Sequence, residues 1–369
     1  MTLPGIDPEL TRFHAPWRLE PYAAFDVERT ATGSGTRPLV VGERTYQVYR
    51  NVNLSVYSGQ RCNAKCGFCV EELRPASRGT SLDLQKQVEP DDTRYFDRLD
   101  DVLTRLKPLD PTLSITGGEP SLDPRLPGIL RRITAHGLRK RTLTTNGSGL
   151  LRRLPASEGG GDVLDALAAA SLAHLNVSRA HPDAGVNQRL MRITPPQTEP
   201  DLRLIFERAV AAHIRPRLSC VLVQGVVSDL AACEAYLSWA AGLGVDNVVF
   251  RQLMQYDPRT SAANSVTRFT DAAFVPLRPI LEAIHPSAPD AAGHPAFEFV
   301  RHVVGYYYAV EVYRYAGPRG PMDVCFEGAD LAGLEARRLE PGGDVIHELI
   351  FHADTALCTT WQPWDGRIL

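Results

Sequence analysis

The chain has 369 residues, and its 40 Lys and Arg residues against 43 Asp and Glu residues leave a formal net charge of −3. A composition of 44% hydrophobic and 22% charged residues excludes intrinsic disorder as the main state, and the near-neutral charge argues against duplex DNA as a partner. The sequence has no apolar run near the ~18 residues of a membrane helix and no signal-peptide pattern, so we expect a cytoplasmic protein with no membrane or nucleic-acid partner.

The first 50 residues predict an N-terminal arm. Pro and Gly residues punctuate residues 1–35, which we expect to be irregular. Residues 39–49 alternate apolar and polar side chains on both sides of Gly42-Glu43, which predicts a β-hairpin. Residues 53–58 alternate again and predict the first strand of the core.

Three of the seven cysteines follow this strand in a C-x3-C-x2-C spacing, at Cys62, Cys66 and Cys69. An odd number of cysteines in a chain without a signal peptide argues against a disulfide framework. Three thiolates on one short loop suit either zinc or three corners of an iron–sulfur cluster. Structural zinc usually takes a fourth Cys or His close by in sequence, and the next histidine and cysteine, His136 and Cys220, are both far along the chain. The spacing therefore favours a cluster with one iron free for another ligand, with zinc as the alternative.

Helices and strands alternate from the cysteines to residue 254. Helical apolar spacing and short apolar runs that end in Gly or polar residues mark these elements. The expected helices are residues 91–107, 162–172, 199–213 and 227–242, and the expected strands are residues 113–117, 141–147, 174–179, 217–223 and 246–254. Such alternation implies parallel strands with right-handed crossovers. With residues 53–58 as the first strand, it fits an α/β fold, a partial (β/α)6 TIM-like barrel whose chemistry lies at the carboxyl ends of the strands.

Glycine and polar motifs follow four of these strands. The strand at residues 113–117 ends in Gly117-Gly118-Glu119-Pro120, where two glycines let a ligand approach the backbone beside one carboxylate. Further candidates lie at the ends of the third, fourth and sixth strands: Thr145, Asn146, Ser178, Gln252 and, beside Gln252, Met254. Each of the polar residues among them is equally suited to cap a helix or a turn.

The motif CNAKCGFC, with GGEP about fifty residues later, resembles the radical S-adenosylmethionine superfamily, in the branch of the molybdopterin-precursor cyclases and peptide maturases. The resemblance covers about residues 50–256. It implies that Cys62, Cys66 and Cys69 hold one [4Fe–4S] cluster, whose fourth iron chelates S-adenosylmethionine. It also implies that other residues contact this cofactor: Phe68, Gly117, Gly118, Glu119, Thr145, Asn146, Ser178, Gln252 and Met254.

The resemblance also implies roles for single residues and a reaction. Phe68 is expected near the adenine, Gly118 and Glu119 at the amino group of the methionine moiety, and Ser178 at the ribose. Reductive cleavage of S-adenosylmethionine would give a 5′-deoxyadenosyl radical that abstracts hydrogen from the substrate, with electrons from an external donor such as flavodoxin or ferredoxin. Gln252 stands where the molybdopterin-precursor cyclases usually carry Glu, which counts against that activity.

The sequence divides into an arm at residues 1–50, a core at residues 51–256 and an α+β extension at residues 257–369 that covers the substrate side. Within the extension we expect a helix at residues 271–284. Strands are expected from Phe297 to Tyr315, with an aromatic face that belongs to the core.

Two cysteines of the extension, Cys325 and Cys358, are candidate catalytic thiols, because a thiol is able to donate a hydrogen atom to a substrate radical. A buried structural role is the alternative for each. A second, auxiliary cluster would have to recruit Cys220 and Cys233, which lie on a strand and on an outer helix. We therefore expect one cluster only.

The single cluster and the short arm favour a small-molecule substrate in a biosynthetic pathway over a ribosomal peptide. Arg179, Arg217 and Arg251 lie on or near strand ends, where each suits either an anionic substrate or a structural ion pair. One rival interpretation is a non-catalytic metal- or cluster-binding protein, which leaves GGEP unexplained. Another is an adenine-nucleotide enzyme that shares the barrel, which predicts unchanged activity in Cys66→Ala.

Overall fold

The computed structural model describes the following residues: 35–59, 61–73, 87–138, 141–254, 264–285, 294–304, 308–329 and 345–369. Residues 1–34, most of the expected irregular arm, lie outside these ranges. The described part of the chain contains no helix with the length and apolar content that a membrane crossing requires.

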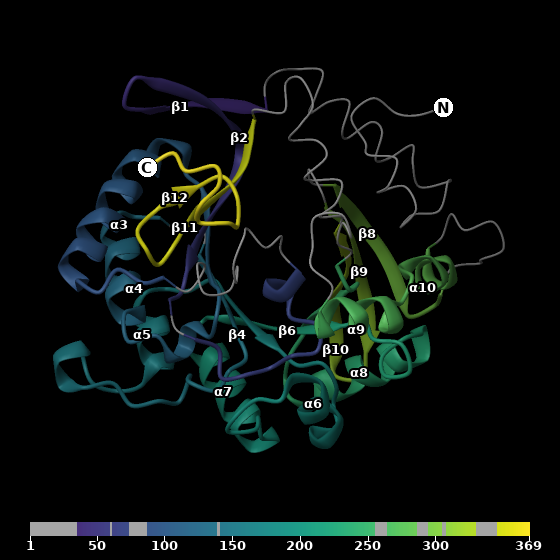
Figure 1. The fold of residues 1–369 in the computed structure, drawn as a ribbon. Coiled ribbons are helices and arrows are strands. Elements are labelled where there is room, and N and C mark those ends of the chain that lie inside the picture. The colour runs from purple at the N-terminus through teal and green to yellow at the C-terminus, as the bar shows by residue number, and fades with distance from the viewer. Residues whose placement is uncertain are drawn as a thin grey trace, which may run out of the picture.

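Six parallel strands form the centre of the sheet, and each crossover between them carries a helix (Figure 1). The strands pair in chain order, and every adjacent pair is parallel. Their bounds are β2 Arg44–Tyr57, β3 Thr112–Thr116, β4 Arg141–Thr145, β5 His174–Ser178, β6 Arg215–Val221 and β7 Asn247–Arg251. This order confirms the partial (β/α)6 barrel, and the sheet is open rather than closed.

The expected hairpin precedes the core. Strand β1 (Thr36–Val41) pairs antiparallel with the first residues of β2, and Gly42 between them has a φ of +60°. Glycine adopts this conformation without steric cost. Strand β2 then continues into the core as one strand of 14 residues, so the hairpin and the first core strand are continuous.

The helices of the crossovers are α3 Asp92–Leu106, α4 Leu126–Ala135, α5 Val163–Ala169, α6 Ala184–Met191, α7 Glu199–Ala211 and α8 Leu230–Gly242. The sequence pattern predicts neither α4 nor α6, because α4 opens with Pro127-Gly128, a pair typical of turns, and α6 is short and polar. Apolar side chains of most of these helices join alternate strand residues such as Leu113 and Ile115 in one buried core.

The other set of alternate strand residues faces away from these helices, on what we call the inner face, and much of it is polar. On β2 and β3, Asn53 Nδ2 donates to the hydroxyls of Ser55 and Ser114 at 2.9 and 3.1 Å. On β5, Asn176 donates to Thr144 at 3.4 Å. Closed barrels fill this space with bulky branched side chains. Here the inner face instead offers hydrogen-bonding groups.

The extension begins with two helices where the sequence predicts one. Helix α9 (Ser265–Ala273) ends before the segment 274–276, and α10 (Leu277–Ile284) begins directly after it. The prediction of one helix at residues 271–284 is therefore wrong. Pro276 accounts for the break, because proline lacks an N–H and its ring clashes with the preceding helical turn.

The extension then contributes strands to both edges of the core sheet (Figure 1). Its strands are β8 Phe297–Val304, β9 Tyr308–Gly317, β10 Gly320–Ala329, β11 Ile346–Phe351 and β12 Leu357–Cys358. Strand β10 runs parallel to β7, and β11 runs parallel to β2. The aromatic residues Phe297, Tyr313 and Tyr315 are buried in the core, as expected.

The packing of β11 beside β2 predicts a large effect on stability for Leu349→Ala, because Leu349 is 0% exposed. We expect the free energy of unfolding in urea to fall by about 2–5 kcal/mol, the usual cost of a buried Leu→Ala change. Val40→Ala is the matched control, since Val40 lies on β1 and is 60% exposed. It should change stability by at most about 0.5 kcal/mol. Equal effects of the two substitutions would contradict the packing of β11 on β2.

Candidate active site

The cysteine loop follows β2 and lies against the end of α6. The backbone N–H of Lys65 donates to Met191 O at 3.0 Å, and that of Gly67 donates to Leu190 O at 3.0 Å. A short 3₁₀ helix (Val70–Leu73) follows the last cysteine. Because α6 follows β5, these bonds hold the loop over the carboxyl ends of the strands.

The three thiols of the loop influence one another electrostatically. Cys62 is exposed, and Cys66 and Cys69 are half-buried. Burial, followed by the charges of Cys69 and Cys62, raises the pKa of the Cys66 thiol to about 12. Three thiolates at this place therefore need a cationic centre to offset their repulsion. Among the described residues, no three His, Cys, Asp or Glu side chains converge on a single metal ion.

Two asparagines link the loop to the end of β4. Asn146 Nδ2 donates to Asn63 Oδ1 at 2.8 Å and lies 3.9 Å from Cys62 Sγ. Asn63 Nδ2 in turn donates to Ser148 Oγ at 3.0 Å. Asn146 thus positions the first thiol. Asn63 is absent from the residues predicted from sequence, although it lies inside the cysteine motif.

The GGEP segment turns at the end of β3. Gly117 and Gly118 have φ angles of +83° and +48°, and a Cβ on Gly117 would lie 2.5 Å from the Tyr57 ring. These positions therefore require glycine, for conformation at both and for space at Gly117. The glycines let the chain turn so that the following Glu119 side chain is buried at the sheet end.

The carboxylate of Glu119 joins the ends of β3 and β4. It accepts hydrogen bonds from Ser121 N at 2.9 Å, Ser121 Oγ at 2.6 Å and Asn146 N at 2.7 Å, and from the Thr145 hydroxyl. Burial raises the pKa of Glu119, and these hydrogen bonds oppose the rise. Both carboxylate oxygens are thus engaged within the chain, and so is the Thr145 hydroxyl. Their expected contacts with a cofactor stay predictions.

Gln197 joins Asn146 to the end of β5. Its Nε2 donates to the carbonyl of Ser178 at 2.9 Å and also to that of Asn146. Its Oε1 accepts from Arg179 Nη1 at 3.3 Å and from Asn187 Nδ2 at 3.2 Å. Gln197 lies in a Pro-rich loop with no local sequence signal, so sequence reasoning does not find it.

The remaining expected cofactor contacts lie toward the end of β7. Gln252 Nε2 donates to Val275 O at 2.8 Å, whereas Gln252 Oε1 is buried and has no partner among the described residues. Met254 follows it and is half-buried. Phe68 from the cysteine loop packs in the same apolar cluster as Leu253. This packing connects the cysteine loop to the β7 side of the sheet.

The four other cysteines differ in accessibility. Cys325 is half-buried on the inner face of β10, where burial raises the pKa of its thiol and the charge of Arg217 opposes the rise. Cys358 is 0% exposed and donates to Pro363 O at 3.7 Å, and burial raises the pKa of its thiol to about 12. Cys220 and Cys233 are both fully buried.

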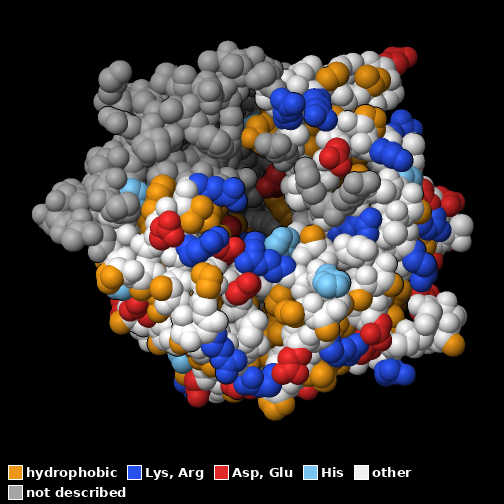
Figure 2. Space-filling view, turned by 180° about the vertical axis from the view of Figure 1, so that it is seen from behind, with side chains coloured by type: hydrophobic (Ala, Val, Ile, Leu, Met, Phe, Trp, Pro, Cys, Tyr) orange, Lys and Arg blue, Asp and Glu red, His pale blue; other side chains and the backbone are white. Residues whose placement is uncertain are grey.

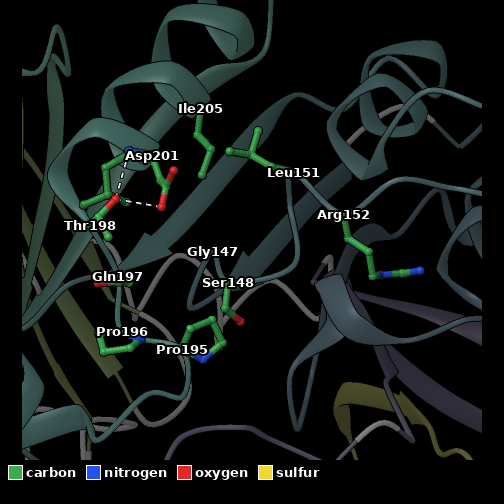
Figure 3. Close-up of a pocket in the computed structure, with 11 residues that line it drawn as sticks. Gly147, Ser148, Leu151, Arg152, Pro195, Pro196, Gln197, Thr198, Asp201 and Ile205 are labelled. Carbon is green, nitrogen blue, oxygen red and sulfur yellow. Dashed lines mark hydrogen bonds between the residues drawn. The ribbon is translucent and has the colours of Figure 1, made fainter.

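A cavity of about 300 Å³ lies between the loop after β4 and the start of α7 (Figure 3). Leu151 and Ile205 form an apolar side, and Thr198 bonds to Asp201 on the other side, with 2.6 Å between Thr198 Oγ1 and Asp201 Oδ2. None of the residues expected to bind cofactor lines it. Figure 2 shows a separate hollow near the middle of the opposite view, with charged side chains and histidine around it.

The comparison with known families agrees with this geometry. Residues 56–226 match the family described as the radical SAM superfamily, a span that runs from the end of β2 past the end of β6. This part of the chain is therefore similar to the radical SAM superfamily. The matched region contains the three cysteines, GGEP and the polar ends of β4 and β5.

Curated relatives match a smaller part of the chain. The GTP 3′,8-cyclase of Xanthomonas campestris pv. campestris (strain B100) is 34% identical over 109 residues, which are 29% of this chain and 30% of that protein. The protein of Xanthomonas axonopodis pv. citri (strain 306) with the same name is 34% identical over 110 residues. The match thus spans less than a third of either relative's length, since it covers 30% of the second relative too.

Solved structures with some likeness include Streptococcus suis SuiB bound to the precursor peptide SuiA, with a TM-score of 0.41 and 16% identity. The aligned part covers 65% of this chain and 45% of SuiB. TsrM, a radical S-adenosylmethionine methyltransferase from Kitasatospora setae, aligns with a TM-score of 0.37 and 17% identity over 55% of this chain and 36% of TsrM. Likeness at these TM-scores carries no argument about function.

The superfamily implies a [4Fe–4S] cluster and S-adenosylmethionine as cofactors. The donor set fits such a cluster, because three thiols lie on one loop. Burial and the charges of the other two thiols oppose ionisation of Cys66, and a bound cationic cluster would offset both effects. Cys62, Cys66 and Cys69 would hold the cluster. The neighbouring strand ends carry backbone and polar groups that would contact the second cofactor.

The accessibility of the thiols predicts their order of alkylation in metal-free protein. At pH 7.5 iodoacetamide should modify exposed Cys62 first and Cys66 much later, because a pKa of about 12 leaves little Cys66 thiolate. Peptide mass spectrometry over time measures the order. Fully buried Cys220 is the slow control. Modification of Cys66 as fast as Cys62 would contradict the site as described.

Proposed function

We propose that this chain is a radical SAM enzyme that abstracts a hydrogen atom from a small polar molecule in a biosynthetic pathway, with one [4Fe–4S] cluster and S-adenosylmethionine as cofactors. The observation that carries the proposal is the hydrogen-bonded unit of Glu119, Asn146 and the cysteine loop. It stands at the carboxyl ends of parallel strands, where such folds place their chemistry, above a polar inner face.

The chain's own residues orient the groups that react. Asn146 and Asn63 hold the loop that carries Cys62, and the α6 carbonyls hold the rest of it. When bound, the cluster and S-adenosylmethionine supply a 5′-deoxyadenosyl radical for hydrogen abstraction. Phe68 and its apolar neighbours exclude water beside the reacting groups, which protects a reactive species from side reactions.

The other expected contacts enter the proposal as lining of the cofactor site. The Gly117-Gly118 backbone and the side chains of Ser178 and Gln252 stand at the ends of β3, β5 and β7. Gln252 Oε1 supports a cofactor contact at this residue, since it is buried with no donor in the described part of the chain, and such an acceptor is costly unless a ligand donates to it. We infer that Glu119 and Thr145 act mainly by holding these ends in place.

The polar inner face supports a small polar substrate in preference to a ribosomal peptide. Cys325 lines this face and is our candidate for a catalytic thiol, whereas buried Cys358 is not part of the proposal. We place the reaction in the cytoplasm, with flavodoxin or ferredoxin as the electron donor. The GTP cyclisation named for the relatives is not proposed, because Gln252 stands in place of the expected Glu.

Anaerobic reconstitution tests the proposal. We expect about four irons per chain, as one [4Fe–4S] centre requires, and dithionite-dependent release of 5′-deoxyadenosine from S-adenosylmethionine. Cys62→Ala should abolish the product, because it removes one of three ligands. Lys65→Ala is the matched control in the same loop, since Lys65 is exposed and its hydrogen bond to the described residues is made by the backbone N–H. It should keep both iron and product.

Other outcomes would change the conclusion. Bound metal without any deoxyadenosine would overturn the catalytic proposal in favour of a metal- or cluster-binding protein. Deoxyadenosine formation that survives in Cys62→Ala would equally contradict it. About eight irons per chain would require a second cluster and would favour a peptide substrate.

A further inference from the structure

Three arginines stand on or beside the inner face of β6 and β7, and two of them are paired. Arg215 lies 2.8 Å from Asp323 and 3.4 Å from Asp246. Arg251 lies 3.4 Å from Glu327. These pairs use the carboxylates of β10 and of the turn before β7. They leave the third arginine, Arg217, without a carboxylate partner in the described part of the chain.

Arg217 is held in place by one hydrogen bond, which leaves most of its donors available to a ligand. Its Nε donates to Asn247 Oδ1 at 2.8 Å, and Asn247 is buried. Its two terminal nitrogens have no hydrogen-bond or ion-pair partner among the described residues, although the side chain is half-buried. Burial lowers the pKa of Arg217, and so do the like charges of Arg251 and Arg215, whereas Cys325 and Glu327 oppose this change. The two terminal nitrogens are thus available to an anion, and the planar guanidinium is suited to bind a carboxylate or phosphate with both of them.

Other residues near Arg217 supply a hydrogen-bond acceptor and one opposing negative charge. Asn176 pairs with Arg217 in the register of β5 and β6 and is only 9% exposed, and its Oδ1 has no donor among the described residues. Glu327 of β10 acts on Arg217 as a negative charge, but it is paired with Arg251. His174 precedes Asn176 on the same strand face, and burial, followed by the charges of Arg217 and Arg215, lowers the pKa of His174. Arg217 and Asn176 thus offer a cation and an acceptor side by side.

Arg217 lies near the amino end of β6, away from the proposed cofactor site at the carboxyl ends of the strands. Arg217 precedes the end of β6 by four residues, which is roughly 13 Å of strand at ~3.3 Å per residue. In the next row of the sheet, Ser219 pairs with Val249 and Val249 pairs with Cys325. Cys325 therefore lies between the level of Arg217 and the carboxyl ends of the strands. A molecule that reached from Arg217 to those ends would pass this thiol.

We propose that Arg217 is the anchor of a substrate subsite on the inner face, where it binds a carboxylate or phosphate group of the substrate beside Asn176. This inference rests on the proposed function and names its substrate class, a small anionic molecule with a hydrogen-bond donor near the anionic group. Arg217 binds the anion through its two terminal nitrogens, and Asn176 Oδ1 accepts the neighbouring donor. The substrate then extends past Cys325, with the reacting C–H bond at the carboxyl ends of the strands.

The test uses inorganic phosphate and acetate as probes, titrated by anaerobic calorimetry into the reconstituted full-length protein with S-adenosylmethionine bound. We expect at least one of the two probes to bind. The probe with the lower dissociation constant identifies the anionic group of the substrate. Arg217→Gln should weaken this binding about tenfold or more, because it removes a charge-assisted, two-pronged contact. Arg217→Lys should be intermediate, since it keeps the charge but loses the planar fork.

Arg215→Gln is the matched control. Arg215 stands two residues away on the same strand and face, but its guanidinium is already paired. It should change probe affinity by less than about twofold, because exposed ion pairs contribute little. Failure of both probes to bind wild-type protein, or equal binding by wild type and Arg217→Gln, would overturn the inference.

Two further measurements assign the site to the substrate. S-adenosylmethionine should bind Arg217→Gln within about twofold of wild type, since the proposed anchor lies away from the cofactor contacts. Competition between the cofactor and the probe, or a tenfold loss of cofactor affinity, would assign Arg217 to the cofactor and overturn the inference. Deoxyadenosine release by wild type is measured in parallel. Its absence, together with Arg217-dependent anion binding, would overturn the proposed function and leave the anion site standing.

Discussion

The buried carboxylate of Glu119 is the interaction on which the arrangement of this site depends. It is 1% exposed and collects donors from Ser121, Thr145 and Asn146, so one side chain holds two strand ends together. Burial of a carboxylate is unfavourable, and hydrogen bonds to a charged acceptor, at about 1.5–3 kcal/mol each, offset that cost. Asn146 then carries the constraint onward to the cysteine loop.

A second constraint is the division of the sheet into two chemically different faces. Apolar residues at every second strand position pack against helices, which stabilises the barrel through the hydrophobic effect. The remaining positions are free of that requirement and carry polar groups. Because of this separation, the apolar face stabilises the fold and the inner face offers polar groups to a ligand. Arg217 is the clearest instance, because within the described residues only its Nε is hydrogen-bonded and its two terminal nitrogens have no partner.

The extension covers both edge strands of the core sheet with further strands. Strands β10 and β11 come from outside the matched radical SAM domain, yet they continue its parallel sheet at β7 and β2. Pairing satisfies the backbone groups that an edge strand would otherwise expose. It also brings Cys325, Asp323 and Glu327 onto the inner face beside the arginines of β6 and β7. The extension thus shapes the charge of the inner face as well as the stability of the sheet.

Much of the fold follows from local sequence patterns. Period-two strands, helical apolar spacing and the motifs at Cys62–Cys69 and Gly117–Pro120 predict the strand order and the place of the chemistry, because each signal lies within a few residues. Helix α4 is not predicted, and the prediction of one helix across Pro276 is wrong. Both fail because a turn-forming pair or a proline can either begin a helix or end one, depending on the context.

The tertiary structure alone decides which polar groups are left without partners. Arg179, Arg217 and Arg251 are equivalent in sequence, but Arg179 is 1% exposed and donates to the carbonyls of His181 and Pro182. Arg251 Nη1 lies 3.4 Å from Glu327, whereas neither terminal nitrogen of Arg217 has a partner within the described residues. Partners such as Glu327 and Gln197 come from distant segments. Sequence spacing therefore sets the chemistry that is available, and long-range packing sets which of it remains for a ligand.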